Sequence, residues 1–192
     1  MAPNSPKSGS DPAMVSLVRW IEAATRFFGL LGAWLCGPLI LTMVWEVFSR
    51  YVLSTPTIWA YEIGYMLMGA GLMFGIGYAA QTRSHVRVDF LYGALSERKK
   101  ALIDLIGLLL LLPMVLWLVS GLWHYLGTAY ASGERSGESF WNPVVWPFRV
   151  TFVLGFVLFA MQIIAEIVKA GHVLLHGEPL PVASDTHTGR PA

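Results

Sequence analysis

Four long apolar segments constrain the fold of this 192-residue chain more than any other feature. They span residues 27–45, 63–80, 105–123 and 150–165, and none of them contains Asp, Glu, Lys or Arg. An α-helix rises ~1.5 Å per residue, so ~20 residues cross a hydrocarbon core of ~30 Å. Because lipid offers the backbone no hydrogen-bond partners, segments of this length must be helical. The sequence therefore predicts an all-α integral membrane protein with four transmembrane helices.

Composition narrows the functional classes. The chain is 55% hydrophobic and carries a net charge of only +1, which does not indicate a nucleic-acid-binding protein. Cys36 is the single cysteine, so an intramolecular disulfide and a cysteine-rich metal site are both excluded. The apolar segments hold no other ionisable residue, although a proton relay or a carboxylate ion site would require one. We therefore expect neither an enzyme nor a cofactor held by this chain.

Lys and Arg residues are unevenly distributed along the chain. Ten of the 13 lie in the N-terminal flank, in the connection between the second and third spans, or in the C-terminal tail. Only Arg50, Arg135 and Arg149 fall on the opposite side. Because cytoplasmic loops are enriched in Lys and Arg, this asymmetry predicts that both termini are cytoplasmic. The first apolar segment is too long for a signal-peptide core, so we expect it to be retained as a span.

The predicted membrane domain covers residues 17–176. The flanking tails, residues 1–16 and 177–192, are rich in Pro, Ser and Gly and are expected to be disordered. Residues 81–100 mix apolar and charged side chains, which favours a short interfacial segment between the second and third spans. This segment is either a positively charged membrane anchor or a clamp on another subunit.

Small residues recur at intervals of four in the first two spans, where they form flat stripes on which another helix can pack. They are Gly29, Ala33 and Gly37 in the first span, and Gly71, Gly75 and Ala79 in the second. The stripes either pack on each other or dock onto a different subunit. Pro38 and Pro113 lie inside the first and third spans and are expected to bend them.

Acid–base pairs spaced four residues apart lie near both ends of the first span and share a helix face. They are Glu22 with Arg26, and Glu46 with Arg50. Glu62 begins the second span and could also meet Arg50 across the short turn. These residues serve either to anchor helix ends or to contact a partner.

The connection between the third and fourth spans has two contrasting halves. The first half is polar and is expected to be flexible, and the second half holds aromatic residues and two prolines. Such aromatics belong either to a membrane-surface belt or to an edge that receives an extracytoplasmic protein. The candidate docking residues are Glu134, Glu138, Ser139, Trp141 and Trp146.

Four apolar spans are also compatible with two other functional classes, a redox-complex anchor and an autonomous transporter. Four-helix anchors of redox complexes bind haem through histidines on facing helices. The best-placed pair, His85 and His172, lies outside the apolar segments, which disfavours haem binding. The redox anchor is the alternative function. An autonomous transporter is less well supported, because the two halves of the chain do not match as inverted repeats.

Three patches give the chain a family resemblance. The first is WEVFSRYV at residues 45–52, followed by Trp59 and Glu62. The second is HVRVD at residues 85–89, and the third is Glu138-Ser139 followed by the prolines and tryptophan of residues 143–147. Between residues 20 and 169 the chain resembles DctQ-like proteins, the small membrane subunits of tripartite ATP-independent periplasmic (TRAP) transporters.

The resemblance implies a specific role in the bacterial inner membrane. In such transporters a periplasmic binding protein delivers a solute, usually an organic acid, to a large permease subunit that couples import to sodium. The small subunit braces the large one and helps dock the binding protein, while the substrate and sodium sites lie in the large subunit. The residues expected to contact the large subunit are Glu46, Arg50, Glu62, Gly71, Gly75, His85, Arg87 and Asp89.

Overall fold

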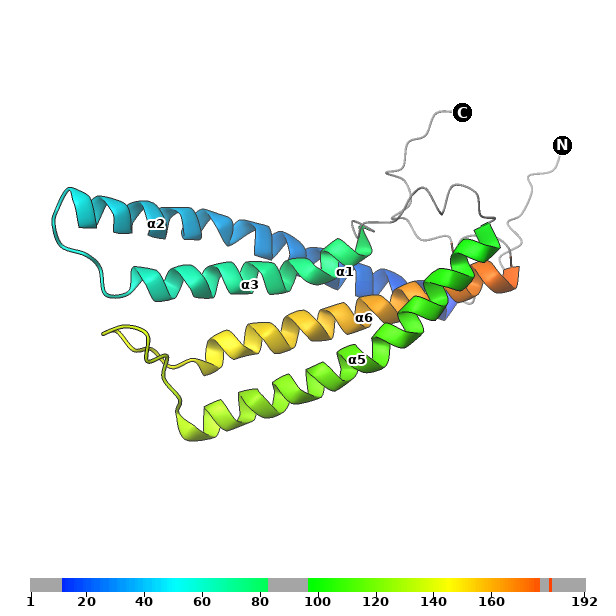
Figure 1. Ribbon diagram of the computed structural model, residues 1–192. Helices are drawn as coiled ribbons and strands as arrows, with labels where there is room; N and C mark the ends of the chain where they lie inside the picture. Colours follow the sequence, from blue (N-terminus) through cyan, green and yellow to red (C-terminus); the bar gives the residue numbers. More distant parts are fainter. Residues whose placement is uncertain (1–11, 83–96, 177–179, 181–192) are drawn as a thin grey trace, which may run out of the picture.

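Helices account for the secondary structure of the described part of the chain, apart from one isolated β-bridge. The computed structural model describes residues 12–82, 97–176 and Leu180. The helices are α1 (Pro12–Trp34), α2 (Cys36–Tyr51), α3 (Ala60–Gln81), α5 (Glu97–Ser132) and α6 (Trp146–His176) (Figure 1). The expected tails, the interfacial segment and the predicted contact residues His85, Arg87 and Asp89 lie wholly or mostly outside the described residues.

Four helical segments are long and apolar enough to cross a membrane, as predicted. They are Pro12–Tyr51, Ala60–Gln81, Lys99–Ser132 and Trp146–Leu175, so α1 and α2 together form the first span. The helices of the first, third and fourth spans extend well beyond their apolar segments. The 36 residues of α5 correspond to roughly 54 Å at the usual helical rise, which exceeds a hydrocarbon core of ~30 Å.

The bundle has two distinct ends (Figure 1). At one of them, the terminal end, α1 and α5 begin and α6 ends. The α2–α3 and α5–α6 connections lie at the other, the loop end. Packing of Val18 and Ile21 of α1 against Ala165 of α6 confirms that the first and last helices meet at the terminal end.

The first span is interrupted near its middle. Leu35 separates α1 from α2, and the backbone bonds Leu35 N to Leu31 O and Leu39 N to Leu35 O bridge the break. Pro38 has no N–H to donate to the carbonyl of Trp34 four residues earlier, which explains the interruption. Pro113, in contrast, lies inside α5, which continues through it as one bent helix (Figure 1).

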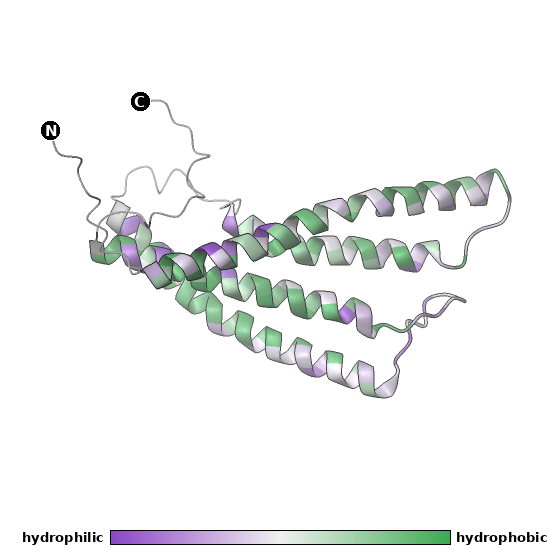
Figure 2. Cartoon of the chain, turned by 180° about the vertical axis from the view of Figure 1, so that it is seen from behind, coloured by the Kyte–Doolittle hydropathy of each residue, from purple (hydrophilic) through white to green (hydrophobic). Residues whose placement is uncertain are grey.

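Helix α6 forms the centre of the bundle and packs against α1, α3 and α5. Val115 of α5 and Phe159, Ala160 and Ile163 of α6 form one buried apolar cluster. Outward-facing side chains are also apolar, and Leu41, Trp34 and Trp117 are more than 70% exposed. Figure 2 shows hydrophobic residues along the helices and the strongest hydrophilic colour towards the two ends. This distribution suits a surface surrounded by lipid or by another membrane protein.

Glycines set the closest helix crossings. A Cβ atom at Gly32 would lie 2.8 Å from the carbonyl oxygen of Gly71, so α1 and α3 touch through their backbones there. A Cβ atom at Gly155 would lie 2.6 Å from the carbonyl oxygen of Met73, which defines the α3–α6 crossing. Gly71, which was predicted to contact the large subunit, therefore packs against α1 of the same chain, whereas a Cβ atom at Gly75 would meet no described atom within 4 Å. Gly32 was not among the small residues that the sequence analysis singled out.

A buried ion cluster joins α1 to α6 near the terminal end. Lys169 Nζ donates to Glu22 Oε1 at 2.9 Å and also pairs with Glu166. Gln162 Nε2 donates to Glu166 Oε1 at 3.1 Å. The expected pairing of Glu22 with Arg26 is therefore replaced by a bond between helices, because Glu22 is only 5% exposed and faces α6.

Candidate functional site

The α5–α6 loop, residues 133–145, is folded at the loop end of the bundle. Val145 N donates to Glu134 O at 3.1 Å, and Ser136 N donates to Pro143 O at 3.0 Å. An antiparallel bridge pairs Arg135 with Val144 between these bonds. The polar first half of the loop was expected to be flexible, and this was wrong, because its backbone pairs with the proline-rich second half.

Glu62, at the first turn of α3, holds this loop against the bundle. Its side chain is fully buried, and Oε1 accepts a hydrogen bond from Ser136 Oγ at 2.8 Å and another from Ser139 Oγ. Each serine oxygen in turn accepts a backbone N–H, from Glu138 for Ser136 and from Trp141 for Ser139. The carboxylate therefore determines the loop conformation through two hydroxyl groups. Glu62 does not need the suggested pairing with Arg50.

A second polar cluster closes the α2–α3 turn. Glu46 Oε1 accepts from Arg50 Nε at 2.9 Å, which confirms the predicted pair. Glu46 Oε2 accepts from the backbone N–H of Thr57 at 3.0 Å and from its hydroxyl. Ser49 Oγ donates to Thr55 O at 2.7 Å, so the end of α2 and the turn are tied together.

Arg149, in the first turn of α6, is nearly buried between α5 and the loop. Its guanidinium carbon lies 3.4 Å from the centroid of the Tyr125 ring, a cation–π geometry. Nη1 donates to Tyr125 O at 3.1 Å, and Nη2 donates to Glu134 Oε1 at 2.6 Å. Glu134, predicted to be a mobile docking residue, is therefore paired with Arg149 inside the chain.

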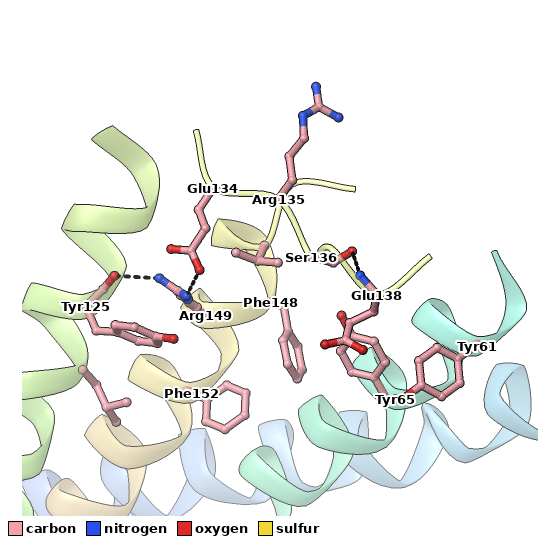
Figure 3. Close-up of a pocket in the computed structure, with 12 residues that line it drawn as sticks. Tyr61, Tyr65, Tyr125, Glu134, Arg135, Ser136, Glu138, Phe148, Arg149 and Phe152 are labelled. Atoms are coloured by element: carbon pink, nitrogen blue, oxygen red, sulfur yellow. Dashed lines mark hydrogen bonds and ion pairs between the residues drawn. The ribbon is translucent and has the colours of Figure 1, made fainter. Parts of the chain in front are cut away.

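A groove of about 560 Å³ opens between α3 and α5, with α6 as its floor and the α5–α6 loop above it (Figure 3). A row of edge-on aromatic rings follows it from Tyr61 and Tyr65 of α3 to Phe148 and Phe152 of α6, with centroids 5.7, 5.6 and 4.9 Å apart. Gly69 permits this row, because a Cβ atom there would lie 2.7 Å from the Phe148 ring.

The remaining docking candidates lie around the mouth of the groove and on its outer edge. The side chain of Glu138 points towards Tyr65 (Figure 3). Trp141 and Trp146 are 42% and 37% exposed, and Phe140 between the docking residues is 97% exposed. Trp146 packs edge-on against Tyr130 of α5 at 5.7 Å. Phe140 was not singled out from the sequence, although it directly follows Ser139.

The structure brings together residues that the sequence analysis treated separately. Glu62 was assigned to contact with a large subunit and Ser139 to docking of a binding protein, yet the two side chains bind each other. Arg149 was noted only for its charge. Its position directly before a long apolar segment could have indicated a structural role, because a charge buried there requires a partner.

The described residues contain no group of three or more His, Cys, Asp or Glu side chains placed to hold a metal ion. The polar groups of the loop end instead bind one another and fix the shape of the surface.

Comparison with known proteins identifies the family. Residues 39–171 match the family described as "Tripartite ATP-independent periplasmic transporters, DctQ component". The chain belongs to this family. DctQ components are parts of transporters and not a known enzyme family, and the four apolar helices make this DctQ component a multi-pass membrane protein.

A curated relative agrees with this assignment. The chain is 30% identical over 77 residues to the sialic acid TRAP transporter permease protein SiaT of Haemophilus influenzae (strain 86-028NP). The match covers 38% of this chain and 12% of the relative, so the chain corresponds to only a small part of that permease. No solved structure matches the chain.

Proposed function

We propose that this DctQ component is the small permease subunit of a sodium-coupled TRAP transporter that imports an organic acid or a related small solute. The observation that carries the proposal is the family match over residues 39–171, which includes all four membrane spans in whole or in part. In this role the chain braces a large permease subunit, and the substrate and sodium sites belong to that partner.

The orientation follows from charge. The terminal end is cytoplasmic and the loop end is periplasmic, because ten of the 13 Lys and Arg residues belong to the termini and the connection between α3 and α5. The return of α6 to the end at which α1 begins supports having both termini on one side. The groove and the α5–α6 loop then face the periplasm.

The large subunit binds along the outer faces of α2 and α3. Gly75 supports this placement, because the space beside it is open and a flat helix face allows another helix to approach closely. The ion pair of Glu46 and Arg50 fixes the end of α2 next to this surface. His85, Arg87 and Asp89 extend the contact beyond the described residues at the other end of α3.

The periplasmic binding protein docks on the outer edge of the α5–α6 loop. Phe140 and Trp141 supply exposed aromatic area, which is typical of binding hot spots. Ser139 holds this edge through Glu62, and Glu134 holds it through Arg149. A loop fixed in advance loses less entropy on binding than a flexible one.

Purification of the full chain from its own membranes in mild detergent tests the assignment. We expect a large multi-span permease to co-purify in stoichiometric amount and to be identified by mass spectrometry. A haem- or flavin-bearing partner would instead support a redox anchor, and the absence of any partner would contradict the bracing role.

Substitution of Phe140 by Ser tests docking separately. Removing an exposed aromatic side chain should leave the permease complex intact but raise the concentration of binding protein needed for half-maximal uptake, since the lost contact lies on the docking edge. Uptake assays in proteoliposomes at several binding-protein concentrations measure this shift. Leu175→Ser, at an equally exposed position near the terminal end, is the control. An unchanged concentration dependence in Phe140→Ser would remove this residue from the docking surface.

A further inference from the structure

The groove at the loop end has an amphipathic lining. Aromatic and aliphatic side chains such as Phe148, Phe152 and Leu122 supply apolar surface, and charged side chains of the α5–α6 loop lie above the rings of Phe148 and Phe152 (Figure 3). α6 keeps the walls apart, so the groove opens sideways between α3 and α5. A ligand suited to this shape has a polar end and an apolar end.

The polar lining carries both signs of charge in equal number. Arg135 and Arg149 are cationic, and Glu134 and Glu138 are anionic. Arg149 binds Glu134, but the carboxylate of Glu138 has no hydrogen bond or ion pair with any described residue. That carboxylate is directed towards Tyr65 (Figure 3). A carboxylate in this position can accept charge-assisted hydrogen bonds from the N–H groups of an ammonium group.

The groove also offers positive potential for an anion. Arg149 lies in the first turn of α6, where the helix dipole adds partial positive charge to that of the guanidinium. Because Arg149 already binds Glu134, it offers a phosphate only long-range attraction, whereas the Glu138 carboxylate can accept hydrogen bonds from an ammonium group. The zwitterionic headgroup of an aminophospholipid carries both of these groups.

The depth of the groove agrees with a lipid ligand. It lies where α3 and α6 begin, at the polar boundary of two membrane spans, which is the level of lipid headgroups. We propose that it binds the headgroup and upper acyl chain of an aminophospholipid, with the ammonium at Glu138 and the chain along Phe148 and Phe152. The proposal does not depend on transport, since it concerns this chain and the bilayer.

Native mass spectrometry of the full chain in detergent tests it. The probes are phosphatidylethanolamine, its N-monomethyl, N-dimethyl and N-trimethyl derivatives, and phosphatidylglycerol. We expect phosphatidylethanolamine to bind at least about tenfold more tightly than phosphatidylglycerol, given the strength of charge-assisted hydrogen bonds. Affinity should fall as methylation removes the N–H donors. Glu138→Gln should abolish the preference, and Asp104→Asn, which removes a carboxylate of α5 outside the groove, should keep it.

Three results would overturn the inference. They are equal affinity for the ethanolamine and glycerol lipids, an unchanged preference in Glu138→Gln, or equal binding of the trimethylated lipid. A photo-crosslinking residue in place of Leu122, which lines the groove, gives an independent check in native membranes and should capture lipid. Capture of a protein subunit alone would assign the groove to a protein side chain instead.

Discussion

Glu62 combines full burial with a negative charge, and the serines that bind it lie 74 and 77 residues further along the chain. A buried carboxylate is strongly destabilising unless hydrogen bonds compensate for its lost hydration. Ser136 and Ser139 supply part of that compensation at Oε1, whereas Oε2 has no hydrogen-bond partner among the described residues. The sequence made both Glu62 and Ser139 candidates through their separate patches, but it could not pair them, because no local periodicity relates residues so far apart.

Replacing Glu62 with Ala should loosen the α5–α6 loop. Both serine hydroxyls lose their acceptor, and we expect a loss of about 1–3 kcal/mol in stability. Thermal unfolding in detergent and limited proteolysis of the loop measure the two effects. Glu62→Gln retains an amide oxygen as acceptor and should recover most of the loss. An alanine variant that unfolds and is cleaved like the wild type would contradict this role.

At the scale of whole helices, sequence reasoning predicted the four spans because helix rise and bilayer thickness leave little choice. It also predicted that Pro38 perturbs the first span, although the expected bend is a break between α1 and α2. It predicted the crossing points only in part. Gly29 and Gly71 of the two stripes lie at the α1–α3 contact, where a Cβ atom at Gly29 would be 2.5 Å from the Cβ atom of Tyr78. The stripes missed Gly32 and Gly155, because the residue that touches depends on the angle and register of the partner helix.

Leucine substitutions distinguish an internal crossing from an open face. Gly155→Leu places a side chain against the Met73 carbonyl and should destabilise the chain by about 1–3 kcal/mol or prevent folding. Gly75→Leu meets no described atom and should change stability by less than about 0.5 kcal/mol, while reducing co-purification of the permease. Thermal unfolding and pull-down yield provide the two readouts. Equal stability loss in both variants would show that Gly75 also faces the interior.

At the scale of the molecule, polar groups concentrate at two ends separated by apolar helices. The distribution of Lys and Arg can be read directly from the sequence, and it predicts which end is cytoplasmic. The groove could not be predicted from the sequence, because its lining comes from α3, α5, α6 and the loop. Nothing in the sequence around Tyr65 or Arg149 indicates that the two side chains line the same cavity.

Cysteine labelling tests the orientation. In a Cys36→Ser background, Phe140→Cys at the loop end should react with a membrane-impermeant maleimide added to spheroplasts, because that end is predicted to be periplasmic. Ala13→Cys at the terminal end should react only after the membrane is permeabilised. Both positions are exposed, so accessibility within the chain does not limit either reaction. The reverse labelling pattern would invert the topology.

Assembly with the permease provides a further prediction at this scale. Arg87→Ala or Asp89→Ala should lower both the yield of the complex and solute uptake, since these charges belong to the HVRVD patch that the family resemblance assigns to contact with the large subunit. Arg135→Ala, which removes a charge at the opposite end, should leave complex yield unchanged. Normal yield and normal uptake in both the Arg87 and Asp89 variants would exclude this part of the contact surface.

The bond between Glu62 and the α5–α6 loop also orders events during biosynthesis. Ser136 is added to the chain 74 residues after Glu62, which takes roughly 4–15 s at ordinary rates of translation. During that interval the carboxylate has only water or the insertion machinery as a partner. The loop end can therefore close only after α5 and the first half of the α5–α6 loop have been synthesised, so this bond records the arrival of the second half of the chain at the first.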